Sequence, residues 1–226
     1  DYHEMDSIYY PRVRSMISPR PIPSKILNQP EYAAARMWWA LGQRAGLTTK
    51  LLDLGISWET VWEELQGTRI PSVIAGEFWY GNNSGAKLSL DRNYLKHAEN
   101  SGYLDIVTQQ NVTAIQEGPD GRYVVVANEI DVNGSVLAQR KYVVKKLFLA
   151  TGSIGTSKLL VRAKARNWLP ALNNDVGKNW GNNGDFFSQL TDLNTRIKPN
   201  LGGTVPVVIE DHHNLIAPTS VECYAD

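Results

Sequence analysis

The sequence predicts a mixed α/β fold, with part of a doubly wound domain that carries a β-meander and part of a second domain with a sheet and cap helices. Three β-rich runs, at 103–118, 122–134 and 136–152, are joined by Pro-Asp-Gly and Asn-Gly turns. Helical patterns precede these runs, and the last run passes through an apolar strand into another helix. Together, these three observations favour a meander inserted in an α/β domain.

Changes in composition along the chain suggest where the domains divide. We expect residues 1–75 to form the cap region of the second domain and residues 76–185 to belong to the doubly wound domain. Residues 186–226 are expected to add strands to the second domain. Within the first segment, Pro recurs five times in residues 1–30, which predicts a covering loop because Pro lacks a backbone donor.

Two helices are predicted after this loop. Glu31–Ala45 is rich in Ala and stops at Gly46, which is a typical C-cap residue. Ile56–Gln66 is amphipathic and has Ser57 as its N-cap. Its apolar face consists of Trp58, Val61, Trp62 and Leu65.

The pattern changes at Glu77. A short strand is predicted there, followed by a Gly-Asn turn and a helix from about Leu90 to Glu99. Ser89 is the expected N-cap of that helix, and Gly102 lies just beyond its end.

The segment Leu147–Gly152, LFLATG, is predicted to be an apolar strand that ends in a turn of small residues. The first N–H groups of the following helix offer donors at this turn, so a nucleotide cofactor could lie against it. A purely structural turn explains the same pattern. The Gly-x-Gly-x-x-Gly fingerprint that seats a pyrophosphate is absent from the sequence.

Composition excludes several classes of function. The 226 residues carry 23 Lys plus Arg and 23 Asp plus Glu, so no net basic field attracts nucleic acid. The single cysteine, Cys223, excludes an internal disulfide framework and a thiolate cluster for zinc or iron–sulfur. We expect no transmembrane segment, since no apolar run is long enough.

Several linked motifs resemble one known family. They are YYPRVRSMI, EFWYGNNSGAKLSLDRNYLKHAENSGYLDIVTQQNVTAI and KKLFLATGSIGTSKLLVRAKARNWLPALNNDVGKNWGNNGD, with the tail to Asp226. In this order they are similar to the middle of the bacterial cholesterol oxidases, which belong to the glucose–methanol–choline (GMC) type of FAD oxidoreductase. The resemblance covers nearly the whole chain and identifies the doubly wound domain as FAD-binding.

The resemblance implies roles for five residues at the cofactor. Trp79 and Val112 would contact FAD, Val112 through its backbone near the adenine. Ala150, Thr151 and Gly152 would pass beside the cofactor, where only small residues and backbone groups can approach a flat ring or a phosphate. A core strand valine is the alternative for Val112.

The chain also departs from the family. The dinucleotide fingerprint and the catalytic His and Asn lie in N-terminal and C-terminal regions that this sequence does not contain, so the remaining parts of the enzyme are expected partners. None of its histidines has the context of the catalytic one, and no metal site is expected at His212 and His213, because adjacent strand residues face opposite ways. The family favours secretion, but a cytoplasmic location is equally compatible with the sequence.

The resemblance implies oxidation of a secondary alcohol on a bulky apolar substrate such as a 3-hydroxysteroid. With a one-residue gap around Ile209–His213, Glu222 falls at the position of the family's catalytic Glu, the base for moving a 5-ene to a 4-ene double bond. A rim carboxylate on an exposed strand is the alternative for Glu222. Two further interpretations of the chain are a GMC-type oxidase or dehydrogenase of another apolar alcohol, and a non-catalytic lobe without its own FAD site.

Overall fold

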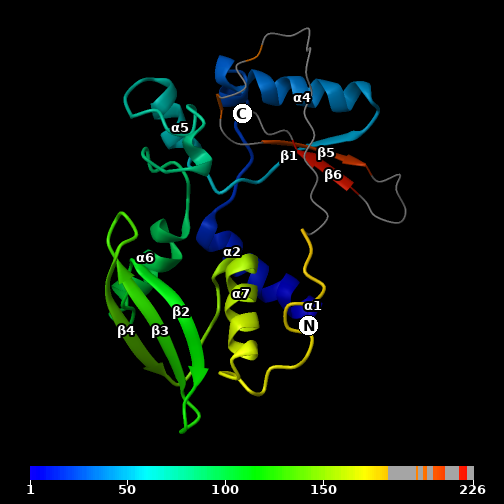
Figure 1. The fold of residues 1–226 in the computed structure, drawn as a ribbon. Coiled ribbons are helices and arrows are strands. Elements are labelled where there is room, and N and C mark those ends of the chain that lie inside the picture. The colour runs from blue at the N-terminus through cyan, green and yellow to red at the C-terminus, as the bar shows by residue number, and fades with distance from the viewer. Residues whose placement is uncertain (183–196, 198–200, 203–205, 212–218, 223–226) are drawn as a thin grey trace. The chain divides into compact units, whose positions relative to one another are not determined.

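The computed structural model describes residues 1–182, 197, 201–202, 206–211 and 219–222. The chain forms two compact units (Figure 1): Asp1–Leu104 with Thr191–Asp226 make the first, and Asp105–Leu190 make the second. Each unit combines helices with an antiparallel sheet. The predicted mixed α/β class, with a β-meander and a separate sheet accompanied by helices, is confirmed.

The first unit begins with a helical segment, so the covering loop predicted for residues 1–30 is wrong over its first half. Helix α1 (Tyr2–Glu4) leads through a π-helical turn, η1 (Met5–Tyr9), into α2 (Tyr10–Ile17). Pro11 lies in the first turn of α2, which directly follows the π-helical turn η1, an irregularity in the helix at the point where Pro lacks a backbone donor. The count of prolines was misleading because only this one falls within the segment.

Seven further helical elements of the first unit follow along the chain. They are α3 (Ser24–Leu27), η2 (Pro30–Tyr32), α4 (Ala33–Arg44), α5 (Trp58–Leu65), η3 (Glu77–Trp79), η4 (Leu90–Arg92) and α6 (Tyr94–Asn100). The two helices predicted at Glu31–Ala45 and Ile56–Gln66 are confirmed as α4 and α5. The hydroxyl of Ser57 accepts the N–H of Thr60 and so caps α5 as predicted.

Helix α4 ends in the way its sequence predicts. Gly46 has a φ of +70°, and its N–H donates to the carbonyl of Gln43. The N–H of Leu47 donates to the carbonyl of Gly42. This pair of bonds is a Schellman motif, which requires the left-handed conformation that glycine adopts without strain.

Two predicted elements around residues 77–100 differ from the structure. The strand predicted at Glu77 is wrong: η3 is a 3₁₀ turn, in which the carbonyl of Glu77 accepts the N–H of Tyr80. Its backbone bonds are therefore local, which leaves no ladder for a strand. The helix predicted from Leu90 to Glu99 is divided into η4 and α6 at Asn93, whose φ of −132° and ψ of −89° are not helical.

The sheet of the first unit has the order β1-β5-β6, from β1 (Thr48–Leu51), β5 (Val207–Asp211) and β6 (Thr219–Glu222). Both pairs are antiparallel. Helix α4 packs across β1 and β5 (Figure 1). The core of this unit gathers buried side chains from α3, η2, α5 and β5, among them Ile26, Tyr32, Val61 and Val207.

The second unit contains the predicted meander, β2 (Gln110–Glu117), β3 (Tyr123–Ile130) and β4 (Val136–Val144), followed by α7 (Gly152–Ala165). All its strand pairs are antiparallel, and α7 packs against β2. Its core is centred on Ile115, Val125, Leu159 and Ala163. These buried side chains hold α7 against the meander.

The apolar strand predicted at Leu147–Leu149 is wrong in one respect, because in the structure these residues pair with no described strand. Leu147 and Leu149 nevertheless pack against the core of the second unit, while Phe148 between them is 89% exposed. Burial thus alternates as it does along a strand. Among the described residues, no helix is long and apolar enough to cross a membrane.

Candidate cofactor-binding site

The turn Ala150–Gly152 lies on the surface of the second unit and opens α7. All three residues are exposed, and Gly152 has a φ of +71°. A Cβ placed on Gly152 would meet no atom within 4 Å. The turn therefore presents bare backbone with open space in front of it, as the approach of a flat ring or a phosphate requires.

The first turn of α7 has no side-chain cap. Thr151 occupies the N-cap position, but its hydroxyl lies 3.0 Å from the hydroxyl of Thr156 and makes no capping bond. The N–H groups of the first helical turn have no partner within a helix, and the helix dipole makes this end positive. A negatively charged or polar group is favoured at this position.

Trp180 lies beside the same turn, although the prediction from sequence did not include it. Its indole Nε1 donates to the hydroxyl of Ser153 over 3.1 Å, and its side chain is 56% exposed. The bond places a half-exposed aromatic side chain next to the start of α7. The only signal in the sequence was the Trp-Gly pair in the Gly- and Asn-rich segment after α7.

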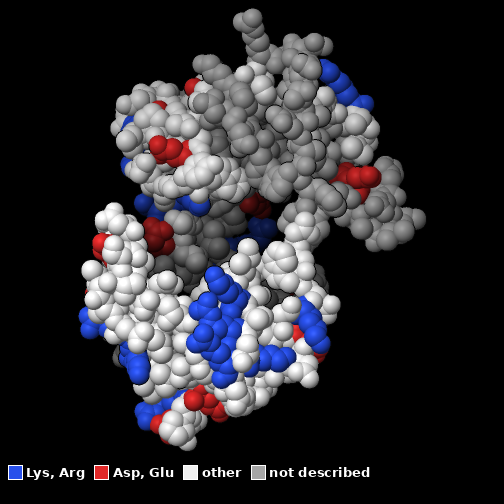
Figure 2. Space-filling model, viewed as in Figure 1, with Lys and Arg blue, Asp and Glu red and all other residues white. Residues whose placement is uncertain are grey.

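Positive charge gathers along α7. Figure 2 shows a continuous area of Lys and Arg over this part of the second unit. Helix α7 supplies Lys158, Arg162 and Lys164, and Arg166 follows it. None of these four side chains forms a salt bridge with a described residue. The surface of α7 is therefore suited to an anion.

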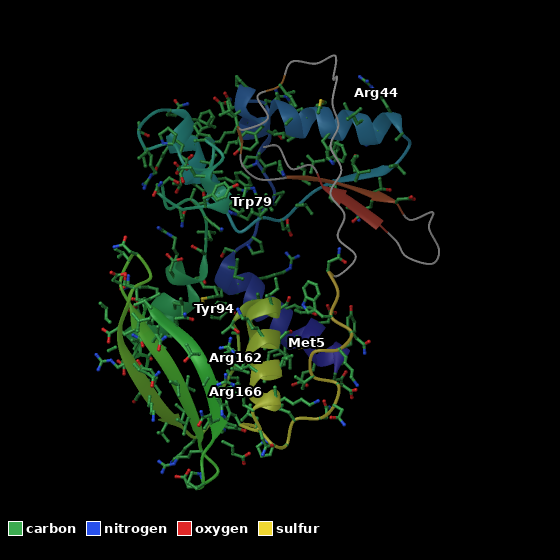
Figure 3. The ribbon with its side chains drawn as sticks, viewed as in Figure 1. Met5, Arg44, Trp79, Tyr94, Arg162 and Arg166 are labelled. Carbon is green, nitrogen blue, oxygen red and sulfur yellow. The ribbon has the colours of Figure 1, made fainter. Side chains whose placement is uncertain are left out.

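Three of these cations are held in place, and two of them, Arg162 and Arg166, are labelled in Figure 3. Lys164 Nζ donates to the carbonyl of Asn173 over 2.7 Å. Arg162 donates to the carbonyl of Thr113 over 3.1 Å, and the guanidinium of Arg166 lies 4.9 Å from the centroid of the Trp168 ring. Thr113 falls at a break in the register of β2, which frees its carbonyl for this bond. Arg162 thus ties α7 to the strand that carries Val112.

Val112 lies on β2 in the same unit as the turn. Its side chain packs against the core with Leu147, Leu149 and Leu159. This is what the core-strand alternative expects, and Val112 pairs with Ala127 of β3 in the ladder. The contact of Val112 with the adenine stays a prediction.

Trp79 ends η3 in the first unit and is labelled in Figure 3. It is 54% exposed and meets Phe78 edge to face, with ring centroids 5.5 Å apart. Lys87 holds this turn by donating to the carbonyl of Phe78 and by lying 4.6 Å from the centroid of its ring. The structure therefore fixes the backbone that carries Trp79, and its contact with FAD stays a prediction.

Glu222 is the last residue of β6 in the first unit. Its backbone pairs with Val208 of β5. Nothing is described of its side chain, so its role as a base stays a prediction. His3 and His97 are exposed, and His212 and His213 lie outside the described residues.

The predicted site residues are divided between the two units, since Trp79 and Glu222 belong to the first unit. Val112, Ala150, Thr151 and Gly152 lie in the second. In the described part of the chain, no group of three or more His, Cys, Asp or Glu could hold a metal ion. The four residues in the second unit offer backbone donors and small side chains, with cations nearby.

Comparison with known families identifies a match over most of the described chain. The model of the GMC oxidoreductase family matches residues 47–182, which is more than half of the chain. The matched segment contains Trp79, Val112 and the turn Ala150–Gly152, and it ends before Glu222.

Proposed function

Because this chain belongs to the GMC oxidoreductase family, whose members are flavin-dependent oxidoreductases, we propose that it is the central portion of a FAD-dependent alcohol oxidase. The proposed substrate is a secondary alcohol on a bulky apolar molecule, such as a 3-hydroxysteroid. The family match over residues 47–182 is the observation that carries this proposal. The steroid itself is suggested by the resemblance of the linked motifs to cholesterol oxidases.

The turn fits a flavin cofactor. Gly152 leaves open space at a positive φ, and the first turn of α7 is uncapped. The cations along α7 add a positive field that suits a pyrophosphate. FAD, when bound, supplies the redox chemistry by accepting the hydride that leaves the alcohol carbon.

In this proposal the protein's own residues position the cofactor and exclude water. Ala150, Thr151 and Gly152 approach it with backbone, and Trp180 covers the start of α7 beside it. Trp79 and the backbone of Val112 make further contacts. Glu222 acts on the substrate: its carboxylate takes a proton from one carbon and returns it to another during isomerisation of the double bond.

The test uses the complete protein that contains these residues. We expect the purified protein to show the visible absorption of oxidised flavin and to oxidise a 3-hydroxysteroid faster than other bulky apolar alcohols. Turnover of another apolar alcohol alone would change the substrate assignment within the family. A protein that neither retains nor takes up FAD would contradict the proposal and favour the non-catalytic lobe.

The place of the cofactor has its own test. Gly152→Val adds bulk at the turn, and Gly102→Val is a matched control, since Gly102 also has a positive φ of +75° and no atom within 4 Å of an added Cβ. Both variants carry the same kind of backbone strain. We expect flavin content to fall in Gly152→Val but not in Gly102→Val. Equal flavin content in the two would place the turn away from the cofactor.

A further inference from the structure

Three buried polar atoms of the first unit make no hydrogen bond to any other described residue. They are Glu31 Oε2, the hydroxyl oxygen of Tyr32 and Glu64 Oε1. Tyr32 is 1% exposed and Glu64 is 2% exposed. Buried polar groups are nearly always hydrogen-bonded, because leaving one unpaired forfeits its hydration without compensation. Each of these three atoms therefore needs an explanation.

Glu64 is held so that one of its oxygens remains free. It lies on the buried side of α5, and its Oε2 accepts the N–H groups of Ser72 and Ile74, both over 3.0 Å. These two bonds fix the carboxylate against the segment that follows α5. Its second oxygen, Oε1, is the unpaired one.

Contacts on the other side of Ile74 reach the backbone of Glu31 and the ring of Tyr32. The carbonyl of Ile74 accepts the N–H of Gly202 over 3.0 Å. A Cβ placed on Gly202 would lie 2.6 Å from the carbonyl oxygen of Glu31 and 3.4 Å from the ring of Tyr32. The N–H of Ile74 therefore bonds to Glu64, and its carbonyl bonds to Gly202, which packs against the end of η2.

The charges agree with this placement. Burial raises the pKa of the Tyr32 phenol, and the negative charges of Glu64 and Glu31 raise it further. Both carboxylates are thus close enough to Tyr32 to act on it, and the phenol keeps its proton. The set then consists of one donor, on Tyr32, and two carboxylate acceptors.

We propose that Tyr32, Glu64 and Glu31 bind one internal water molecule. A water molecule accepts one hydrogen bond from the Tyr32 hydroxyl and donates two, to Glu64 Oε1 and Glu31 Oε2, so it satisfies all three atoms. A metal cation could take lone pairs from the three oxygens but would leave the phenol proton without an acceptor. The water joins η2 to α5 and is independent of the proposed catalytic function.

A crystal structure of the complete protein at high resolution tests this site directly. We expect one density peak at about 2.6–3.0 Å from all three oxygens. Crystals soaked in thallium(I), which replaces monovalent cations and scatters anomalously, should show no anomalous signal there. An anomalous peak would show that the site holds a cation instead of water and would overturn the proposal. A direct hydrogen bond from Tyr32 to a carboxylate, with no density peak between the three oxygens, would also overturn it.

Thermal unfolding gives a second test, in which the sign of the change decides. Tyr32→Phe removes the hydroxyl alone, and Tyr80→Phe is the control because Tyr80 is 90% exposed. If the hydroxyl bonds to the water, Tyr32→Phe should lower Tm by about 2–4 °C, while the control leaves it unchanged. If the hydroxyl is unpaired, its removal relieves a buried polar group, so an unchanged or raised Tm would overturn the proposal.

Discussion

Glu222 carries the most specific role in the proposed function, and its conservative replacement is the corresponding test. Glu222→Gln keeps the size of the side chain but removes the base. In the complete protein we expect conversion of a 5-ene-3-ketone to the conjugated 4-ene product to fall by about 100-fold or more. Flavin content should persist, and alcohol oxidation should fall less.

Glu210→Gln is the control for this variant, because Glu210 lies on the neighbouring strand and pairs with Lys50 over 2.5 Å. It should leave isomerisation unchanged. Isomerisation at the parental rate in Glu222→Gln would make Glu222 a rim carboxylate and would show that the assumed gap is misplaced.

The ion pair between Arg20 and Glu59 makes the stability of the fold depend on pH. Arg20 donates to both oxygens of Glu59, over 2.9 and 2.7 Å, and these bonds lower the pKa of Glu59 from 4.5 to about 2. Since the folded-state pKa is depressed, the pair stabilises the fold above pH 4.5, and this contribution is lost as the pH falls towards 2. Both side chains are at least half exposed, so solvent screens the interaction.

We therefore expect Glu59→Gln to lower the free energy of unfolding by only about 0.2–1 kcal/mol at pH 6. The difference from the parent should shrink to nothing as the pH approaches 2. Urea unfolding at a series of pH values measures it, with Asp6→Asn as a control at an exposed acid without a salt bridge among the described residues. A difference that stays constant down to pH 2 would mean that Glu59 acts by some means other than its charge.

At the scale of elements, α4 meets the sheet of the first unit at Gly42. A Cβ placed on Gly42 would collide with Thr49 Cγ2 and lie 2.9 Å from Ile209 Cγ1. Alanine gains up to about 1 kcal/mol over glycine inside a helix, whereas overpacking a core costs about 1–3 kcal/mol. The packing cost is therefore expected to exceed the gain in helix propensity, so the substitution should lower the free energy of unfolding.

We expect Gly42→Ala to destabilise the protein by up to about 2 kcal/mol, the overpacking cost less the gain in propensity. Thr49→Ser removes the colliding methyl group and keeps the hydroxyl that accepts a hydrogen bond from Gln43. The double variant should recover part of the loss in chemical denaturation. No recovery, or a stabilised single variant, would show that α4 moves away from the sheet at little cost.

Elements whose signals are local could be predicted from the sequence. Helix α5 has an N-cap at Ser57 and a regular apolar face, and the meander has turn residues between alternating strands. The segment Leu147–Leu149 has the composition of a strand, but a strand also needs a partner, which composition does not supply. The N-terminal helix was missed because the position of Pro11 in a first turn matters more than the number of prolines.

The candidate site also has a part that the sequence predicts and a part that it does not. The turn Ala150–Gly152 could be predicted because a strand, small residues and a helix follow one another in the sequence. The bond from Trp180 to Ser153 joins residues 27 positions apart, and the proposed water site of Tyr32, Glu64 and Glu31 depends on tertiary packing. Neither has a local pattern to recognise.

At the scale of the whole molecule, the two compact units have separate cores. Ile56 is fully buried in the first core, and Ile115 is 1% exposed in the second. Truncating a buried isoleucine to alanine costs about 2–5 kcal/mol. The same substitution, isoleucine to alanine, can therefore be made in the core of each unit and the two effects compared.

We expect Ile56→Ala to speed amide hydrogen exchange in α5 and β1 while leaving β2, β3 and β4 protected. Ile115→Ala should have the reverse effect. Hydrogen exchange followed by mass spectrometry of the complete protein resolves these segments. Faster exchange throughout the chain in both variants would mean that the units unfold as one.

The pairing of β1 with β5 affects the order in which the protein can form during synthesis. Thr48 pairs with Glu210, so the whole second unit is made between the two halves of this ladder. The meander needs only neighbouring segments and can close soon after it leaves the ribosome, because short loops cost little entropy. Strand β1 must wait for β5, which is made only after the second unit, and until then its edge is open to wrong partners.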